Sequence, residues 1–111
     1  MKNKSLTHDY NTFIASQLSD KKEAAIFLQV ALEEYEHDGN FSAFLMAVRQ
    51  IVDAQGGIGH LANSTKLNRE NLYRTLSGKT NPKLNTLGLI LNSLGFKLQI
   101  VPSSYASPML K

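Results

Sequence analysis

Apolar residues recur at helical spacing along most of this 111-residue chain, and glycines separate the stretches. One stripe comprises Ala24, Phe27, Leu28, Ala31, Leu32 and Tyr35. A second comprises Phe41, Phe44, Leu45, Val48 and Ile51, and a third comprises Leu84, Leu87, Ile90, Leu91 and Leu94. Residues three and four apart lie on one face of an α-helix, so each stripe predicts an amphipathic helix. We therefore expect an all-α fold held together by these faces.

Capping residues predict where the helices begin and end. Asp20 is expected to cap the first long helix, with Glu23 reaching back as in a capping box. Gly39 should end that helix, and Asn40 should cap the next one. The whole chain suits a single domain over residues 9–101, with a disordered tail before it (1–8) and a flexible tail after it (102–111).

Composition narrows the class of protein. The chain has no cysteine, which excludes disulfides and thiolate metal sites. The three histidines are scattered without metal-ligand spacing, and no credible nucleophile–base pair exists, so we expect no cofactor, no metal and no enzyme activity. No apolar run approaches the roughly 20 residues that span a bilayer, and no signal peptide is evident. We expect a cytoplasmic protein that does not contact a membrane.

Charge divides the chain into two unlike halves. Residues 1–56 carry five Lys or Arg and eight Asp or Glu, whereas residues 57–111 carry seven Lys or Arg and one acid, Glu70. The basic half suits a polyanion such as nucleic acid. The acidic half suits either water or a basic partner.

Residues 61–78, LANSTKLNRENLYRTLSG, predict two short helices joined by a tight turn. Ala62 is small enough for the helices to cross closely, and Leu67 can fill the turn. Leu72 and Leu76, one turn apart, should hold the second helix against the core. This is the pattern of a DNA-reading helix–turn–helix.

If the two leucines face inward, the polar residues of the second helix and the following loop face outward. Arg can pair with guanine and Asn with adenine, and Tyr and Arg can also contact phosphates. Glu70, the only acid on this face, could accept from cytosine or orient Arg74 one turn later. The candidate DNA-binding residues are Lys66, Asn68, Arg69, Glu70, Asn71, Tyr73, Arg74, Ser77, Lys79 and Asn81. The alternative is a helical corner whose polar side chains only face water. The basic half, the cap and the exposed Arg–Tyr–Arg set favour DNA.

The stretch FKLQIV alternates and predicts one β-strand near the C-terminus. Phe96, Leu98 and Ile100 share one face of it. No second strand is evident, and a strand without a partner leaves its backbone unpaired. We expect it to pair with a second copy of the chain or with another protein, the alternative being an extended tail.

Four segments together resemble the HigA-type addiction-module antidote proteins, a subgroup of the Cro/repressor (XRE) helix–turn–helix class. These are AIFLQVALEEYEHDGNFSAFLMAVRQIVDAQGGIGHLA, LNRENLYRTLSG, NPKLNTL and LGFKLQI. The resemblance covers about residues 8–101. It implies a repressor-like domain of five to six helices with one C-terminal strand, in which residues 68–77 read DNA through Arg69, Tyr73 and Arg74. Two departures are Lys66, where glycine is usual and where a left-handed turn carries a steric cost for any other residue, and Asn68, where serine is usual and which should cap the second helix equally well.

The resemblance also implies partners. It predicts a homodimer that binds double-stranded operator DNA, represses its own operon and neutralises a small basic toxin, a ribonuclease of the RelE/HigB type. The acidic residues Glu33, Glu34, Glu36 and Asp38 are the candidate toxin-facing surface, although a solvated helix end explains them equally well. Two alternatives remain open: a stand-alone phage-type transcriptional regulator without a toxin, and a purely protein-binding helical module.

Overall fold

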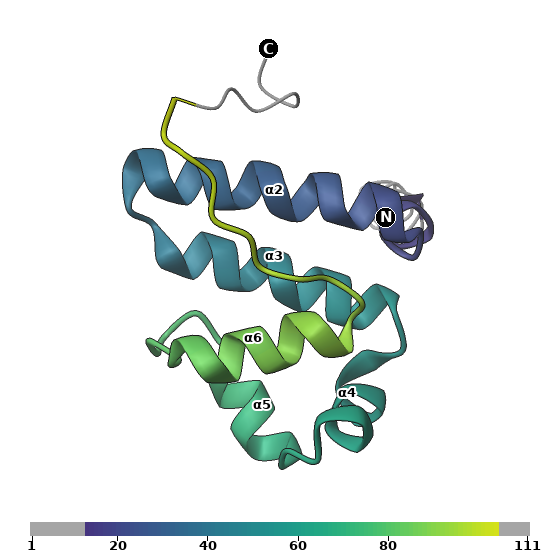
Figure 1. Ribbon diagram of the computed structural model, residues 1–111. Coiled ribbons are helices and arrows are strands. Elements are labelled where there is room, and N and C mark those ends of the chain that lie inside the picture. The colour runs from purple at the N-terminus through teal and green to yellow at the C-terminus, as the bar shows by residue number, and fades with distance from the viewer. Residues whose placement is uncertain (1–12, 105–111) are drawn as a thin grey trace, which may run out of the picture.

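The computed structural model describes residues 13–104, and every regular element in that range is a helix (Figure 1). Residues 13–18 are helical. The following helices are α2 (Lys21–Asp38), α3 (Phe41–Ala54), α4 (Gly57–Thr65), α5 (Arg69–Thr75) and α6 (Leu84–Ser93). The prediction of an all-α fold is therefore confirmed. The predicted tail over residues 1–8 and most of the predicted tail over residues 102–111 lie outside the described range.

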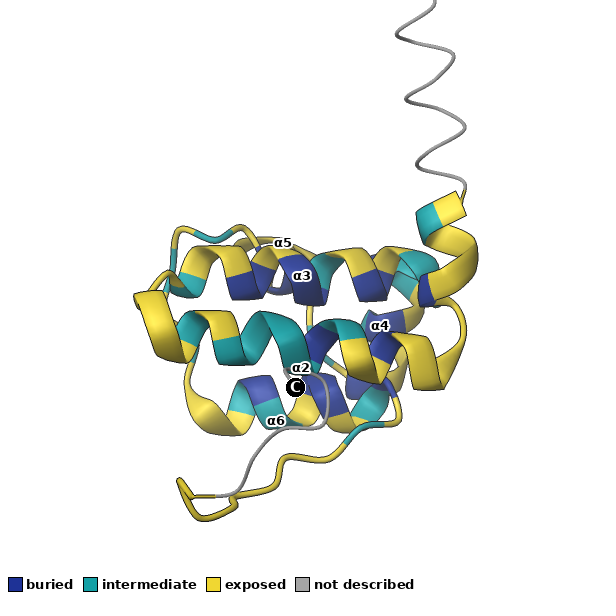
Figure 2. Cartoon of the chain, turned by 90° about the horizontal axis from the view of Figure 1, so that it is seen from above, coloured by how far each residue is buried: buried dark blue, intermediate teal, exposed yellow. Residues whose placement is uncertain are grey.

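Helix α3 is the centre of the fold. It packs against α2 on one side and α4 on the other, and α4 in turn packs against α5 and α6. Helix α3 buries Phe44, Leu45, Ala47, Val48, Ile51 and Val52. Figure 2 shows these buried residues turned inward, while α2 keeps much of its surface exposed. The apolar stripes predicted from the sequence thus meet in one hydrophobic core.

The helix ends follow the predicted caps at two of three positions. Gly39 adopts φ +75°, in the left-handed region where glycine carries no steric penalty, and ends α2. The Asn40 side chain accepts a hydrogen bond from the amide of Ala43 at 3.2 Å and caps α3. The predicted capping box at Asp20 and Glu23 is wrong, because the Asp20 side chain makes no capping hydrogen bond.

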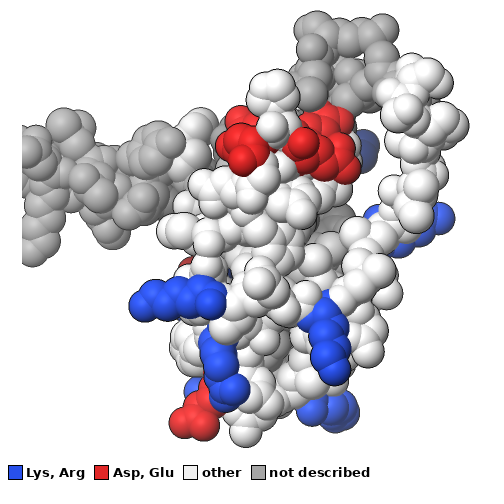
Figure 3. Space-filling view, turned by 90° about the vertical axis from the view of Figure 1, so that its left-hand side faces the viewer, with Lys and Arg blue, Asp and Glu red and all other residues white. Residues whose placement is uncertain are grey.

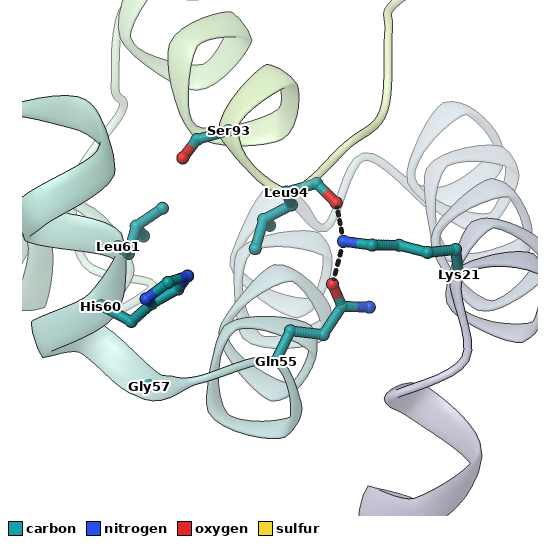
Figure 4. Close-up of a pocket in the computed structure, with 7 residues that line it drawn as sticks. All are labelled: Lys21, Gln55, Gly57, His60, Leu61, Ser93 and Leu94. Carbon is teal, nitrogen blue, oxygen red and sulfur yellow. Dashed lines mark hydrogen bonds between the residues drawn. The ribbon is translucent and has the colours of Figure 1, made fainter.

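Lys21, the first residue of α2, ties three helix ends together (Figure 4). Its ammonium donates hydrogen bonds to the backbone carbonyl of Leu94 at the end of α6 and to the side-chain oxygen of Gln55 at the end of α3. The same ammonium lies 5.7 Å from the centre of the Phe96 ring. A cation at the carbonyl end of a helix also interacts favourably with the helix dipole. Lys21 therefore fixes the point where the chain leaves α6.

Replacing Lys21 with methionine is expected to lower the free energy of unfolding by about 1 kcal/mol, because the Leu94 carbonyl and Gln55 lose a charged donor. Urea unfolding followed by circular dichroism measures the change. Lys22→Met is the matched control, since Lys22 is exposed and makes no side-chain hydrogen bond to another residue in 13–104. Equal destabilisation by the two substitutions would contradict a specific role for Lys21.

The chain after α6 runs back toward α2 without regular secondary structure (Figure 1). The predicted strand over residues 96–101 is not formed within residues 13–104, which contain no strand. A strand needs a partner for its backbone, and no second strand is available in this part of the chain. Pairing with another chain therefore stays a prediction. Among the described helices, none combines the length and the hydropathy that crossing a membrane requires.

Candidate nucleic-acid interface

Helices α4 and α5 meet at a tight turn that two residues define. Lys66 ends α4 with φ 62° and ψ 23°, and it is the only non-glycine residue in 13–104 with positive φ. The neighbouring Thr65 is buried, and its hydroxyl donates to the carbonyl of Leu61 at 2.8 Å. The same hydroxyl oxygen accepts from the amide of Leu67 at 3.2 Å. Thr65 thus connects the last turn of α4 to the residue after the turn, a role that the sequence did not reveal.

The second helix of the pair is capped and held as the sequence predicted. The Asn68 side chain accepts hydrogen bonds from the amides of Glu70 at 2.7 Å and Asn71 at 3.2 Å. Leu72 is fully buried and Leu76 is 2% exposed, so both anchor this segment in the core. The helix itself, Arg69–Thr75, is shorter than the predicted reading helix over residues 68–77. Ser77 lies beyond it, in the loop that leads to α6.

All ten candidate DNA-binding residues are exposed. Lys66 and Asn68 flank the turn, and five residues lie on α5, namely Arg69, Glu70, Asn71, Tyr73 and Arg74. The remaining three, Ser77, Lys79 and Asn81, lie in the following loop. Within that loop, the Ser77 hydroxyl donates to the carbonyl of Arg74 at 2.8 Å and accepts from the amide of Lys79 at 3.2 Å. The loop is therefore ordered against the end of α5.

Arg74 is oriented by a neighbour other than the predicted one. Its guanidinium donates to the side-chain oxygen of Asn71 at 2.9 Å, one turn earlier on the exposed face. The suggested interaction with Glu70 is absent from the ion pairs of residues 13–104, where the pair between Arg49 and Asp53 is the only one. Arg74 and Asn71 thus present a guanidinium and an amide side by side, the groups that pair with guanine and adenine edges.

The other two predicted DNA contacts, Arg69 and Tyr73, lie against residues of neighbouring helices. The Arg69 guanidinium lies against Gly59 of α4, so closely that a Cβ placed there would be 2.6 Å from its terminal nitrogen. The guanidinium of Arg49, from α3, lies 5.0 Å from the centre of the Tyr73 ring, and Asp53 holds that guanidinium at 3.1 Å. Arg49 was missed from the sequence because it belongs to the acidic half of the chain. It adds a cation beside α5.

Charge is segregated on the surface (Figure 3). Acidic side chains gather at the top of this face, where α2 ends, and most of the Lys and Arg side chains project from its lower part. We call Glu33, Glu34, Glu36 and Asp38 the acidic end, and Lys66, Arg69, Arg74 and Lys79 the basic end. The division seen between the halves of the sequence is thus a division in space, which suits two partners of opposite charge.

The remaining predicted residues differ in accessibility. At the acidic end, Glu33 is partly buried, and the Asp38 carboxylate accepts from the amide of Asn40 at 2.9 Å. In the C-terminal segment, Phe96 packs partly against the core, whereas Leu98 and Ile100 are exposed. Phe96 therefore has a role inside the single chain as well as its predicted role in pairing.

One comparison with known proteins identifies a family, and a second finds a relative without an assigned function. The model of a family described as "Probable addiction module antidote protein" matches residues 9–102, most of the chain. An uncharacterized protein of Haemophilus influenzae is 28% identical over 93 residues, which cover 84% of this chain and 91% of that protein. No solved structure gives a significant match.

Proposed function

The chain belongs to the family of probable addiction module antidote proteins, and from this premise we propose that it is the antitoxin of a type II toxin–antitoxin module. In this proposal it acts in the cytoplasm, binds operator DNA, represses its own operon and neutralises a RelE/HigB-like ribonuclease toxin. The finer assignment to the HigA-type branch of the Cro/repressor (XRE) class rests on the sequence resemblance described above.

The observation that carries the DNA-binding part is the geometry of α5. Leu72 and Leu76 anchor the segment, so its opposite face points to solvent with Arg74 and Asn71 joined by a hydrogen bond. We propose that this face enters the major groove, with Lys66 and Lys79 on flanking phosphates. A homodimer would place two such helices on half-sites about one DNA turn, or roughly 34 Å, apart.

The C-terminal segment supports the proposed homodimer. Ile100 is 98% exposed, and residues 97–103 make no backbone hydrogen bond with any other residue in 13–104. An exposed apolar side chain on an unpaired backbone is suited to strand pairing with a second copy. We propose that Leu98 and Ile100 contribute most to this contact, because Phe96 already packs partly on the core. A strand has two hydrogen-bonding edges, and the proposed homodimer uses the edge that faces away from α2.

Arg74→Ala tests the proposed reading helix. Fluorescence anisotropy with the DNA upstream of the gene, measured across a salt series, should show that wild-type binding weakens steeply with salt. The substitution should weaken binding about tenfold or more and reduce discrimination against scrambled DNA, because a guanidinium paired with a base edge is lost. Lys22→Ala removes the same charge from α2 and serves as the control.

The results of operator binding and of co-purification distinguish the antitoxin from its two alternatives. If the wild type shows no operator preference, or if Lys22→Ala weakens binding as much as Arg74→Ala, α5 is not a reading helix. Operator binding together with co-purification of a small basic protein from the native host supports the antitoxin. Operator binding without such a protein supports a stand-alone phage-type regulator, and a bound protein without operator binding supports a protein-binding helical module.

A further inference from the structure

A groove of about 930 Å³ lies between α2 and the chain that follows α6. Leu28 and Leu32 of α2 and Phe44 of α3 line one side, and residues 95–103 line the other. In Figure 3 the described part of the chain after α6 stands away from the body of the molecule, on the right of the acidic side chains. The groove is thus apolar at its base and bordered by the acidic end.

One carboxylate in this groove has an unused acceptor. The Glu33 side chain lines the groove, and its Oε2 accepts a hydrogen bond from the side-chain amide (Nε2) of Gln29 at 2.7 Å. Its other oxygen, Oε1, is buried and has no donor among the described residues. Leaving a buried charged acceptor without a donor is unfavourable, so a cationic donor that reached Glu33 would be bound well. Glu36, one turn later, also lines the groove.

The opposite side of the groove offers an unpaired backbone. The last backbone hydrogen bond of this segment runs from the Phe96 amide to the Leu91 carbonyl at 2.9 Å. From residue 97 to residue 103, the amides and carbonyls pair with nothing else in 13–104. The sequence over residues 96–101 alternates as in a strand. An incoming extended peptide could therefore pair with it by strand addition.

We propose that this groove binds an extended, basic segment of a protein partner. The segment adds a strand along residues 97–101, places apolar side chains on Leu28 and Leu32, and places an Arg or Lys side chain on Glu33. The proposal deepens the proposed function, on which it rests for the identity of the partner as the toxin. Two carboxylates favour a segment with several cations, whereas residues 96–101 of a second copy carry one, Lys97.

The test uses a fluorescein-labelled peptide of about ten residues with alternating valine and arginine, a length typical of a long strand. Anisotropy at physiological salt measures its binding to the full chain. Glu33→Gln should weaken binding about tenfold, because it removes the charge that holds the cation while keeping an oxygen for Gln29. Glu34→Gln is the matched control on the same helix, since Glu34 is exposed and does not line the groove.

Two further peptides separate the contributions of charge and apolar contacts, and one further measurement checks the folding of the variant. A glycine–arginine peptide, which keeps the charge without the apolar side chains, and a valine–glutamate peptide should both bind more weakly. Urea unfolding of Glu33→Gln checks that the variant is folded. Equal losses in the two Gln variants, or equal binding of the valine–arginine and glycine–arginine peptides, would reduce the effect to general charge attraction and overturn the proposal.

Sedimentation velocity shows whether a second copy of this chain, rather than a partner segment, occupies the groove. If the peptide binds only by dissociating a dimer of this chain, a second copy fills the groove and the proposal is wrong. The peptide assay contains neither DNA nor toxin, so its result can contradict the groove proposal without contradicting the proposed function. If the peptide does not bind but the operator does, only the proposal for the groove is wrong. If the peptide binds but the operator does not, only the proposal of a repressor is wrong.

Discussion

Replacing Leu72 with alanine is expected to lower the free energy of unfolding by about 2–5 kcal/mol. The side chain is fully buried between α5 and the core, so its removal leaves a cavity in addition to the lost burial. Helix α5 has only seven residues and cannot be stable by itself, which makes this anchor decisive for the whole segment. Thermal and urea unfolding followed by circular dichroism measure the loss.

Leu84→Ala is the control for this prediction. Leu84 is 73% exposed at the start of α6, so the same substitution should change the free energy of unfolding by less than about 0.5 kcal/mol. If Leu72→Ala were as mild as Leu84→Ala, the packing of α5 described here would be incorrect. Operator binding by Leu72→Ala should fall together with its folded fraction.

The second large effect is expected at Thr65. Thr65→Val keeps the shape of the side chain but removes the hydroxyl that joins the Leu61 carbonyl to the Leu67 amide. Leaving these partly buried groups unpaired should lower the free energy of unfolding by about 2 kcal/mol. Urea unfolding measures this change, and the amide of Leu67 should also lose protection in hydrogen exchange.

Thr86→Val provides the comparison for Thr65. Thr86 lies on α6, is partly buried, and makes no side-chain hydrogen bond to another residue in 13–104. The same exchange of hydroxyl for methyl should therefore be close to neutral there. A Thr65→Val variant as stable as Thr86→Val would mean that the turn after α4 is held by other contacts.

Local features were predictable from the sequence because their partners lie a few residues away. Asn40 and Asn68 accept from amides within three positions, so the residue type and its place before an apolar stripe suffice. Lys66 was expected to adopt a left-handed turn at a steric cost, and its φ of 62° confirms the conformation. Asp20 stands at a similar position, yet its side chain does not cap, so residue type and position alone do not decide whether a cap forms.

Contacts between distant residues were not predictable. Lys21 bonds the carbonyl of Leu94 across 73 positions, and Arg49 reaches Tyr73 from a different helix. Nothing in the local pattern selects either partner, because such contacts follow from how the helices pack. The strand predicted over residues 96–101 depended on a distant partner in the same way. Alternation identifies a segment that can pair, but pairing also needs a second strand, and residues 13–104 contain none.

The separation of the acidic and basic ends has a consequence for how they can influence each other. Helix α3 lies between α2 and α5 (Figure 1) and its backbone makes no close contact with that of α5, so at least one helix width, about 10 Å, separates the two ends. That is more than one Debye length, about 8 Å, at physiological ionic strength. Charge placed on one end is therefore largely screened from the other. Communication between them has to be mechanical, through the one hydrophobic core to which α2, α3 and α5 all contribute buried side chains.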